Sequence, residues 1–325
     1  MTAFLIRRLL QSAALLLVMS MLVFVGVYAI GNPIQLLISP EATQIEKERT
    51  IRNLGLDRPL WEQYLLFLKG SVKGELGNSY IHNIPALKLI LQRLPATFEL
   101  AIVAILIATV LGIPLGLWVG IRPQAIFSRS IMGGSVLGFS LPTFWVGLMM
   151  VLVFSIYLGW LPASGRGRTI EIFGISLSFL TLNGIKHILM PAVNLALYPL
   201  ALVIRLTRTG MMETLLLDFV KFARAKGLTE RRVIFVHVLK NILIPIITVI
   251  GIQFGTLLAF AVVTESIFAW PGMGKLIIDS INLLDRPVIV AYLLITVFIF
   301  TMINLVTDIL YSVLDPRVRL GGSAE

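Results

Sequence analysis

Six stretches of the sequence contain no Asp, Glu, Lys or Arg, and they constrain the fold more than any other feature. They cover residues 9–30, 100–119, 130–161, 188–204, 241–264 and 287–307. A helix needs about 20 mainly apolar residues to cross a bilayer, so the fourth stretch is near the lower limit and the third exceeds one span. Backbone groups in lipid must pair within the chain. The sequence therefore predicts an all-α integral membrane protein with six transmembrane helices.

The composition excludes a soluble globular protein. Hydrophobic residues make up 57% of the chain and charged residues 14%, whereas soluble domains are about one quarter charged. In a soluble chain the net charge of +10 would suggest nucleic acid as a partner, but in a membrane protein basic loops set the orientation. We therefore expect contact with membrane lipid and none with nucleic acid. The sequence has no cysteine, which excludes disulfides and thiolate metal sites.

The distribution of basic residues predicts that both chain ends lie in the cytoplasm. Residues 1–30 are expected to be a retained transmembrane anchor, because their apolar stretch exceeds the core of a signal peptide, about 7–15 residues, and no cleavage pattern follows. In this orientation the short cytoplasmic segments hold fourteen Lys and Arg residues and the two short external loops hold five. Such an excess on the inner side is what the positive-inside rule requires.

Residues 31–95 are expected to form an extracytoplasmic helical segment between the first two transmembrane helices. Residues 40–54 have helical character, Pro59 precedes a second helical stretch at 60–69, and residues 85–91 form a third. A helical cap packed on the external membrane face would explain the pattern. Direct contact with a delivery protein is the alternative.

The rest of the chain is expected to divide into a five-helix core, residues 96–314, and a cytoplasmic tail, residues 315–325. Within the core, the external loop 162–187 contains a glycine-rich turn. Residues 169–179 then alternate with β-branched side chains, which allows a short β-hairpin.

The cytoplasmic loop 208–240, between the fourth and fifth apolar stretches, contains a pattern typical of a short surface helix. Asp218 is suited to be the N-cap of a helix, and Gly227 is suited to end one. Phe219 and Phe222 lie on one face together with Ala223. Such a helix could fit a groove of a partner protein or rest on lipid, and the spacing does not separate these alternatives.

Motifs along nearly the whole chain resemble one family. They are LGLDRPL (54–60), GELGNS (74–79), LPATFEL (94–100), GIPLG (112–116), PTFW (142–145), LGWLPASG (158–165), ARAKGL (223–228), ESIFAWPGMG (265–274) and LDPRVR (314–319). They resemble the B-type transmembrane subunit of ABC importers of the dipeptide, oligopeptide and nickel permease family. The chain departs from the wider superfamily at Lys221 and Phe222, where a Glu-Ala pair is usual, and at Lys240, where proline is frequent.

The resemblance implies that the short helix is a coupling helix, which sits in a cleft of a cytoplasmic ATPase and transmits its closure to the spans. The residues carried over for this role are Asp218, Phe219, Ala223, Ala225, Lys226 and Gly227. It further implies a homologous second permease as a heterodimer partner, two ATP-binding subunits that bind ATP and Mg, and an extracytoplasmic solute-binding protein. The location would be a bacterial or archaeal plasma (inner) membrane.

Ionisable residues near membrane depth are candidates for function, because a charge in lipid is costly. Glu99 and Glu265 border apolar stretches at their external ends, where hydration or helix capping is the simpler explanation. Arg205 and Arg208 are expected to anchor the fourth span at the inner membrane interface. The candidates for a gate or pathway are Glu99, Phe144, Trp145, Glu265 and Trp270.

The chain is not expected to be an enzyme, because it lacks a glycine-rich loop ending in Gly-Lys-Ser/Thr and so cannot hydrolyse ATP itself. No cofactor is expected on this chain. The interpretation is a permease subunit of an importer for di- or oligopeptides. One alternative is the same machinery for nickel or another small solute. The other is an ATP-independent secondary carrier, which usually shows an internal repeat.

Overall fold

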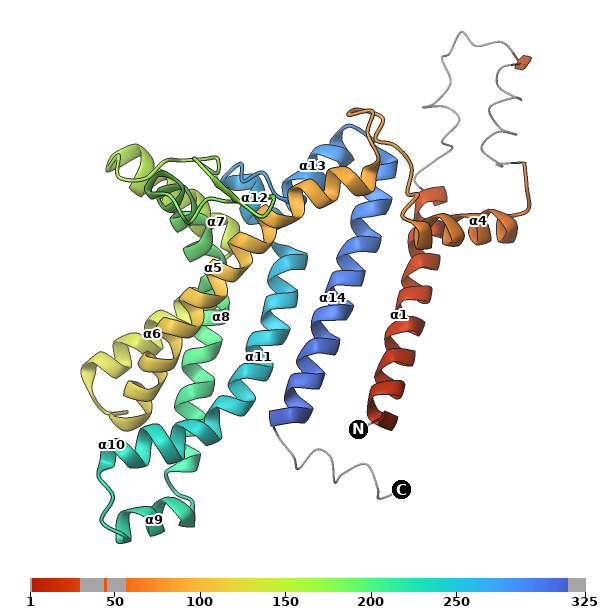
Figure 1. Ribbon diagram of the computed structural model, residues 1–325. Helices are drawn as coiled ribbons and strands as arrows, with labels where there is room; N and C mark the ends of the chain where they lie inside the picture. The colour runs from red at the N-terminus through yellow and green to blue at the C-terminus, as the bar shows by residue number, and fades with distance from the viewer. Residues whose placement is uncertain (1, 30–43, 46–56, 315–325) are drawn as a thin grey trace. The chain divides into compact units, whose positions relative to one another are not determined.

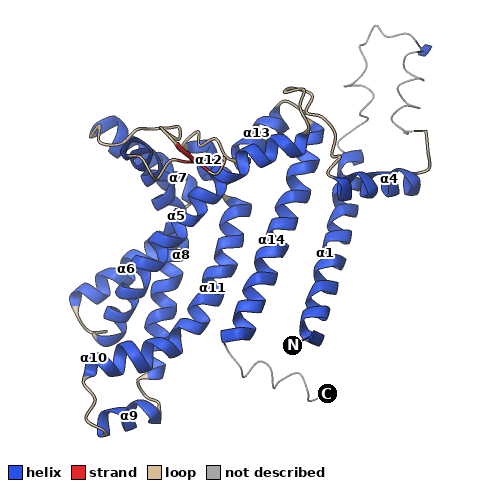
Figure 2. Cartoon of the chain, in the orientation of Figure 1, coloured by secondary structure: helices blue, strands red, loops and turns tan. Residues whose placement is uncertain are grey.

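The structure is a computed structural model that describes residues 2–29, 44–45 and 57–314. These residues form helices and one β-hairpin (Figures 1 and 2). Most of the helical stretch expected at 40–54, and the whole tail 315–325, lie outside the described residues. The elements are α1 (Thr2–Ala29), α4 (Leu60–Lys73), α5 (Ala86–Ile121), α6 (Ile126–Ser140), α7 (Thr143–Met150), the π-helix η1 (Val151–Tyr157), β1 (Ile170–Ile172), β2 (Ile175–Leu177), α8 (Leu182–Thr214), α9 (Asp218–Ala225), α10 (Glu230–Arg232), the π-helix η2 (Val233–Val238), α11 (Leu239–Phe260), α12 (Val262–Ile267), α13 (Met273–Asn282) and α14 (Arg286–Leu314).

Five helical segments in the described part of the chain are long and apolar enough to cross a membrane. They are Ile6–Gly26, Ala86–Ile121, Leu182–Thr214, Glu230–Phe260 and Arg286–Leu310. A sixth is obtained if α6 and the segment Thr143–Tyr157, which meet at a bend of 107°, count as one broken span. Within the described residues, each of the six apolar stretches therefore lies mainly in helix.

The bend follows from Pro142. A proline disfavours the helical conformation of the residue before it, and Leu141 is extended, with φ −77° and ψ 135°. The third apolar stretch is therefore two helices at an angle. From the length of this stretch alone, one span that continues into a loop was expected.

Residues 85–91 differ from their prediction. They were expected to be a separate short helix, but Ala86–Ile121 is one helix of 36 residues with Pro95 and Pro114 inside it. Prolines are tolerated within membrane helices because neighbouring groups satisfy the backbone carbonyls that they free. The stretch is thus the first part of α5. The predicted helix at 60–69 is confirmed as α4.

The chain forms two compact units. One comprises Met1–Leu5, Arg93–Lys275 and Met302–Glu325, and the other comprises Ile6–Gln92 and Leu276–Thr301. In the second unit, α4 packs on α1: Ser20 Oγ and Tyr64 OH are 2.9 Å apart, and the rings of Phe24 and Phe67 are 5.6 Å apart. Burial raises the pKa of Tyr80 in this unit above its ordinary value.

In the first unit, α5 packs closely on α8 through three glycines spaced four residues apart. A β-carbon built on Gly112 would lie 2.8 Å from Val203, and one on Gly120 would lie 2.7 Å from Met211. Small residues at this spacing allow two membrane helices to approach each other. The third glycine, Gly116, lies between the other two.

The loop 162–187 contains the β-hairpin that its sequence pattern allows. β1 and β2 pair antiparallel, with Ile170 opposite Leu177 and Ile172 opposite Ile175, and they are the two strands visible in Figure 2. The turn between them is tight because Phe173 (φ 51°) and Gly174 (φ 77°) are both left-handed.

Candidate functional site

The short helix predicted between the fourth and fifth apolar stretches is present as α9, but Asp218 is not its N-cap as predicted. Leu217, in an extended conformation, precedes the helix, and Asp218 is its first residue. The Asp218 side chain does not cap the backbone; it accepts a hydrogen bond from Lys221 Nζ at 2.9 Å. That hydrogen bond, with the positive charge of Lys221, lowers the pKa of Asp218. A negative charge in the first turn still suits the helix dipole.

The end of α9 is as predicted. Lys226 follows the last helical residue, and Gly227 adopts the left-handed φ of 77°. A residue with a side chain is uncommon in that conformation. The chain then reverses into α10, which continues through η2 into α11 as one segment, Glu230–Phe260. A short turn therefore joins α9 to the helical segment that continues as α11.

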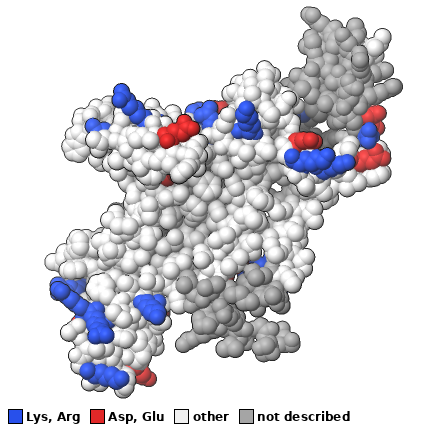
Figure 3. Space-filling view, in the orientation of Figure 1, with Lys and Arg blue, Asp and Glu red and all other residues white. Residues whose placement is uncertain are grey.

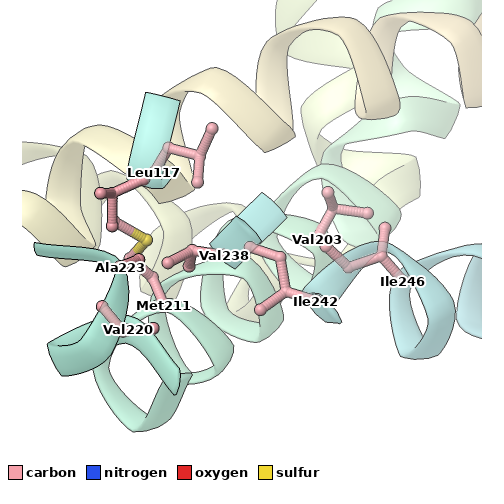
Figure 4. Packing of buried hydrophobic residues seen from close by; sticks show 9 residues of the cluster. Leu117, Val203, Met211, Val220, Ala223, Val238, Ile242 and Ile246 are labelled. Carbon is pink, nitrogen blue, oxygen red and sulfur yellow. The ribbon is translucent and has the colours of Figure 1, made fainter. Parts of the chain in front are cut away.

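The two faces of α9 differ from the prediction in one respect. Phe219 is 40% exposed and Phe222 is 60% exposed, so both aromatic rings are available to a partner. Ala223 was predicted on the same face, but it is buried, as is Val220. Ala223 points into the joint and packs in one core cluster with Met211 of α8 (Figure 4).

The core cluster beneath α9 explains how the helix is held. Apart from Leu117 on α5, its members come from the end of α8, from α9 itself and from η2 and α11 (Figure 4). They are Leu117, Val203, Met211, Val220, Ala223, Val233, Val238, Ile242 and Ile246. This shared core joins α9 to α5, α8 and α11 by close side-chain packing.

The exposed side of the loop is basic, and two of its basic side chains make contacts within the loop. Arg224 Nε donates to Glu230 Oε1 at 2.8 Å, and Lys226 Nζ lies 4.5 Å from the centre of the Phe222 ring. Ala225, which lies between Arg224 and Lys226 in the sequence, is exposed. Figure 3 shows Lys and Arg side chains gathered around α9 and α10.

Three of the five gate or pathway candidates, Glu99, Glu265 and Trp270, form a buried polar framework with residues in the first half of α5. Glu99 accepts hydrogen bonds from Arg166 Nε at 2.9 Å and from Ser178 Oγ at 2.8 Å. The guanidinium of Arg166 also lies 5.7 Å from the centre of the Trp270 ring. These contacts hold the loop that carries the β-hairpin against α5.

Glu265 secures the following loop. It is 0% exposed, and it accepts hydrogen bonds from Thr97 Oγ1 at 2.7 Å and from the backbone N–H of Lys275 at 3.0 Å. Trp270, also fully buried, donates from Nε1 to the carbonyl of Ala96 at 2.9 Å. Glu265 thus satisfies a donor in the first turn of α13, which is helix capping as one sequence interpretation suggested.

The remaining two candidates lie elsewhere. Phe144 is 53% exposed and Trp145 is 45% exposed, both on α7 just after the bend. Sequence reasoning missed Arg166, Thr97 and Ser178 as partners of the two glutamates. Their separations from those glutamates are long, so no local pattern could reveal them. In the described residues, no group of three or more His, Asp and Glu side chains could hold a metal ion.

Comparisons with known proteins agree with this geometry. The family model described as "Binding-protein-dependent transport system inner membrane component" matches residues 112–320, and its N-terminal counterpart matches residues 1–101. The chain belongs to this family. Together with the spans, membership makes it a multi-pass inner-membrane protein.

The relatives cover nearly the full chain. The dipeptide transport system permease protein DppB of Escherichia coli (strain K12) is 36% identical over 98% of this chain and 99% of that protein. The oligopeptide transport system permease protein AppB of Bacillus subtilis (strain 168) is 38% identical over 98% of this chain and 100% of that protein. A solved structure of the MetNI methionine ABC transporter has a TM-score of 0.54 at 16% identity, covering 71% of this chain and 98% of that chain. That likeness shows the fold.

Proposed function

We propose that the chain is one of two transmembrane halves of an ATP-driven importer for di- or oligopeptides. The observation that carries the proposal is α9: a short helix with two exposed aromatic residues, mounted on the ends of α8 and α11 by a shared core. Near full-length similarity to dipeptide and oligopeptide permeases supports the substrate class.

In this function α9 is the coupling helix. Phe219 and Phe222 insert into a cleft of the ATPase, since exposed aromatic side chains are frequent hot spots of protein interfaces. Asp218, Ala225 and Lys226 lie on the exposed surface around them. The two remaining residues act from beneath: Ala223 through its packing in the joint and Gly227 through its left-handed turn.

The proposed assembly contains a homologous second permease, two cytoplasmic subunits that bind ATP and Mg, and an extracytoplasmic solute-binding protein. Both chain ends and α9 face the cytoplasm, and residues 31–95 lie outside. The excess of basic residues in the short segments on the α9 side supports this orientation.

Outside the coupling loop, we assign two different tasks to the gate candidates. Glu99, Glu265 and Trp270 hold the external loops on α5 through their buried contacts. Phe144 and Trp145, which are exposed beside the 107° bend, are available to contact substrate or the second permease.

The test is uptake by the complete transporter in proteoliposomes. The wild type should accumulate a radiolabelled dipeptide only with ATP inside, and Phe222→Ala should weaken ATPase association about tenfold or more. Phe235→Ala is the matched control, because Phe235 is also 60% exposed but lies on η2. ATP-independent accumulation by the wild type would refute the importer, and equal association of both variants with the ATPase would refute the coupling role.

A further inference from the structure

Arg205 of α8 lies on an aromatic platform formed with the neighbouring helix α6. Its guanidinium carbon is 4.6 Å from the centre of the Phe139 ring. That ring in turn stacks on Tyr198, with centroids 5.0 Å apart and an interplanar angle of 25°. We call these three side chains the arginine shelf.

The guanidinium of the arginine shelf has no counter-charge within the described part of the chain. Its one hydrogen bond there runs from Nε to the carbonyl of Ala201 at 3.4 Å, and no carboxylate forms an ion pair with it. Arg208, one turn further along α8, has a buried Nε without a partner among the same residues. Unpaired cations within a membrane helix are costly, which favours an anionic partner at this position.

The aromatic side chains of the shelf are partly exposed. Phe139 is 45% exposed and Tyr198 is 40% exposed. Because both rings of the shelf are partly exposed, a small ligand with a flat anionic end can approach the guanidinium.

We propose that the arginine shelf binds the terminal α-carboxylate of the transported peptide, an inference that rests on the proposed import of peptides. Arginine presents a planar fork of N–H donors that matches a carboxylate in two parallel hydrogen bonds. Every linear peptide carries this carboxylate whatever its side chains are, so one residue can serve substrates of many sequences. Phe139 holds the guanidinium flat, and Tyr198 extends the surface for the last residue of the peptide.

The position along α8 suits a late step of transport. The helix has 33 residues, about 50 Å at 1.5 Å per residue, and is therefore longer than the bilayer core of about 30 Å. Arg205 lies nine residues before Thr214, the last residue of α8. In the proposed orientation this is the inward half of the span, where a lipid phosphate is the competing anion.

The first experiment compares uptake of one dipeptide as its free acid and as its C-terminal amide, using the complete transporter. Arg205→Gln should lower uptake of the free acid about tenfold and leave the amide at the wild-type rate. Uptake of the free acid by Arg205→Lys should lie between that of the wild type and that of Arg205→Gln, because lysine keeps the charge but lacks the planar fork of N–H donors. Arg129→Gln is the control, since Arg129 is exposed on α6 and contacts Gln124. Every variant is assayed with the same solute-binding protein, so any preference of that protein for the acid or the amide is the same in all variants.

A second experiment removes the solute-binding protein altogether. Tyr198→Cys gives this cysteine-free chain a single thiol on the shelf. Saturating free-acid dipeptide should slow alkylation of that thiol, while the amide should not, and Arg205→Gln should abolish the protection. Equal protection by acid and amide, or equal loss of their uptake in Arg205→Gln, overturns the carboxylate site and favours a lipid anchor. If the wild type imports neither peptide, the proposed function itself fails.

Discussion

Gly116 on α5 faces Thr207 on α8 so closely that a β-carbon built on the glycine would lie 2.5 Å from Thr207 Cβ. The two helices therefore meet at backbone distance, and the hydroxyl of Thr207 is buried without a partner among the described residues. The same helix α5 carries Glu99 of the buried polar framework and Leu117 of the core under α9.

Gly116→Ala should destabilise the protein by about 1–3 kcal/mol, the usual cost of overpacking. The added methyl group can be accommodated only if α5 and α8 separate. Thermal unfolding of the purified chain in nanodiscs measures the effect. Gly133→Ala is the matched control, because it adds the same group to a helix at a position with nothing within 4 Å. Equal unfolding midpoints in the two variants would contradict the close packing.

Arg166→Ala should cost about 3–5 kcal/mol of stability, because it leaves the buried Glu99 carboxylate without its cation. Adding Glu99→Gln to that variant should recover part of the loss, since the uncompensated charge is removed. Arg168→Ala, two residues along the same loop and exposed, should be close to neutral. The same nanodisc unfolding assay applies, and a double variant less stable than Arg166→Ala would argue against charge compensation.

Ala223→Glu and Ala225→Glu should fail in different ways. Ala223 is 6% exposed within the joint, so a carboxylate there lacks a partner and lowers the stability of the isolated chain by several kcal/mol. Ala225 is exposed, so a glutamate there should leave stability unchanged and weaken only ATPase association. Unfolding of the chain alone and pull-down of the ATPase separate the two effects. Loss of stability in both variants would show that the faces of α9 are assigned wrongly.

Single cysteines test the orientation, because the chain has no background thiol. Val72→Cys on α4, where the native side chain is 85% exposed, should react with a membrane-impermeant maleimide in intact cells. Ala225→Cys should react only after the inner face is made accessible. Labelling of Ala225→Cys in intact cells would overturn the orientation and, with it, the coupling role of α9.

Much of the fold was readable from local patterns. Uncharged stretches long enough to span lipid identified the helical regions, because a backbone in lipid has no alternative to internal hydrogen bonding. Gly227 marked the end of α9, since the left-handed conformation favours glycine. The alternation after Gly165 indicated the β-hairpin that β1 and β2 form.

The tertiary structure decided which faces meet. A membrane helix such as α5 is apolar all round, so periodicity does not reveal that Gly116 faces α8. Local spacing placed Ala223 beside Phe219 and Phe222, but packing against α8 and η2 turned it inward. The pairing of Glu99 with Arg166, and the placement of Arg205 over Phe139, join residues 67 and 66 positions apart in the sequence. Partners at that distance are chosen by how the helices pack, because no local backbone preference acts over such a separation.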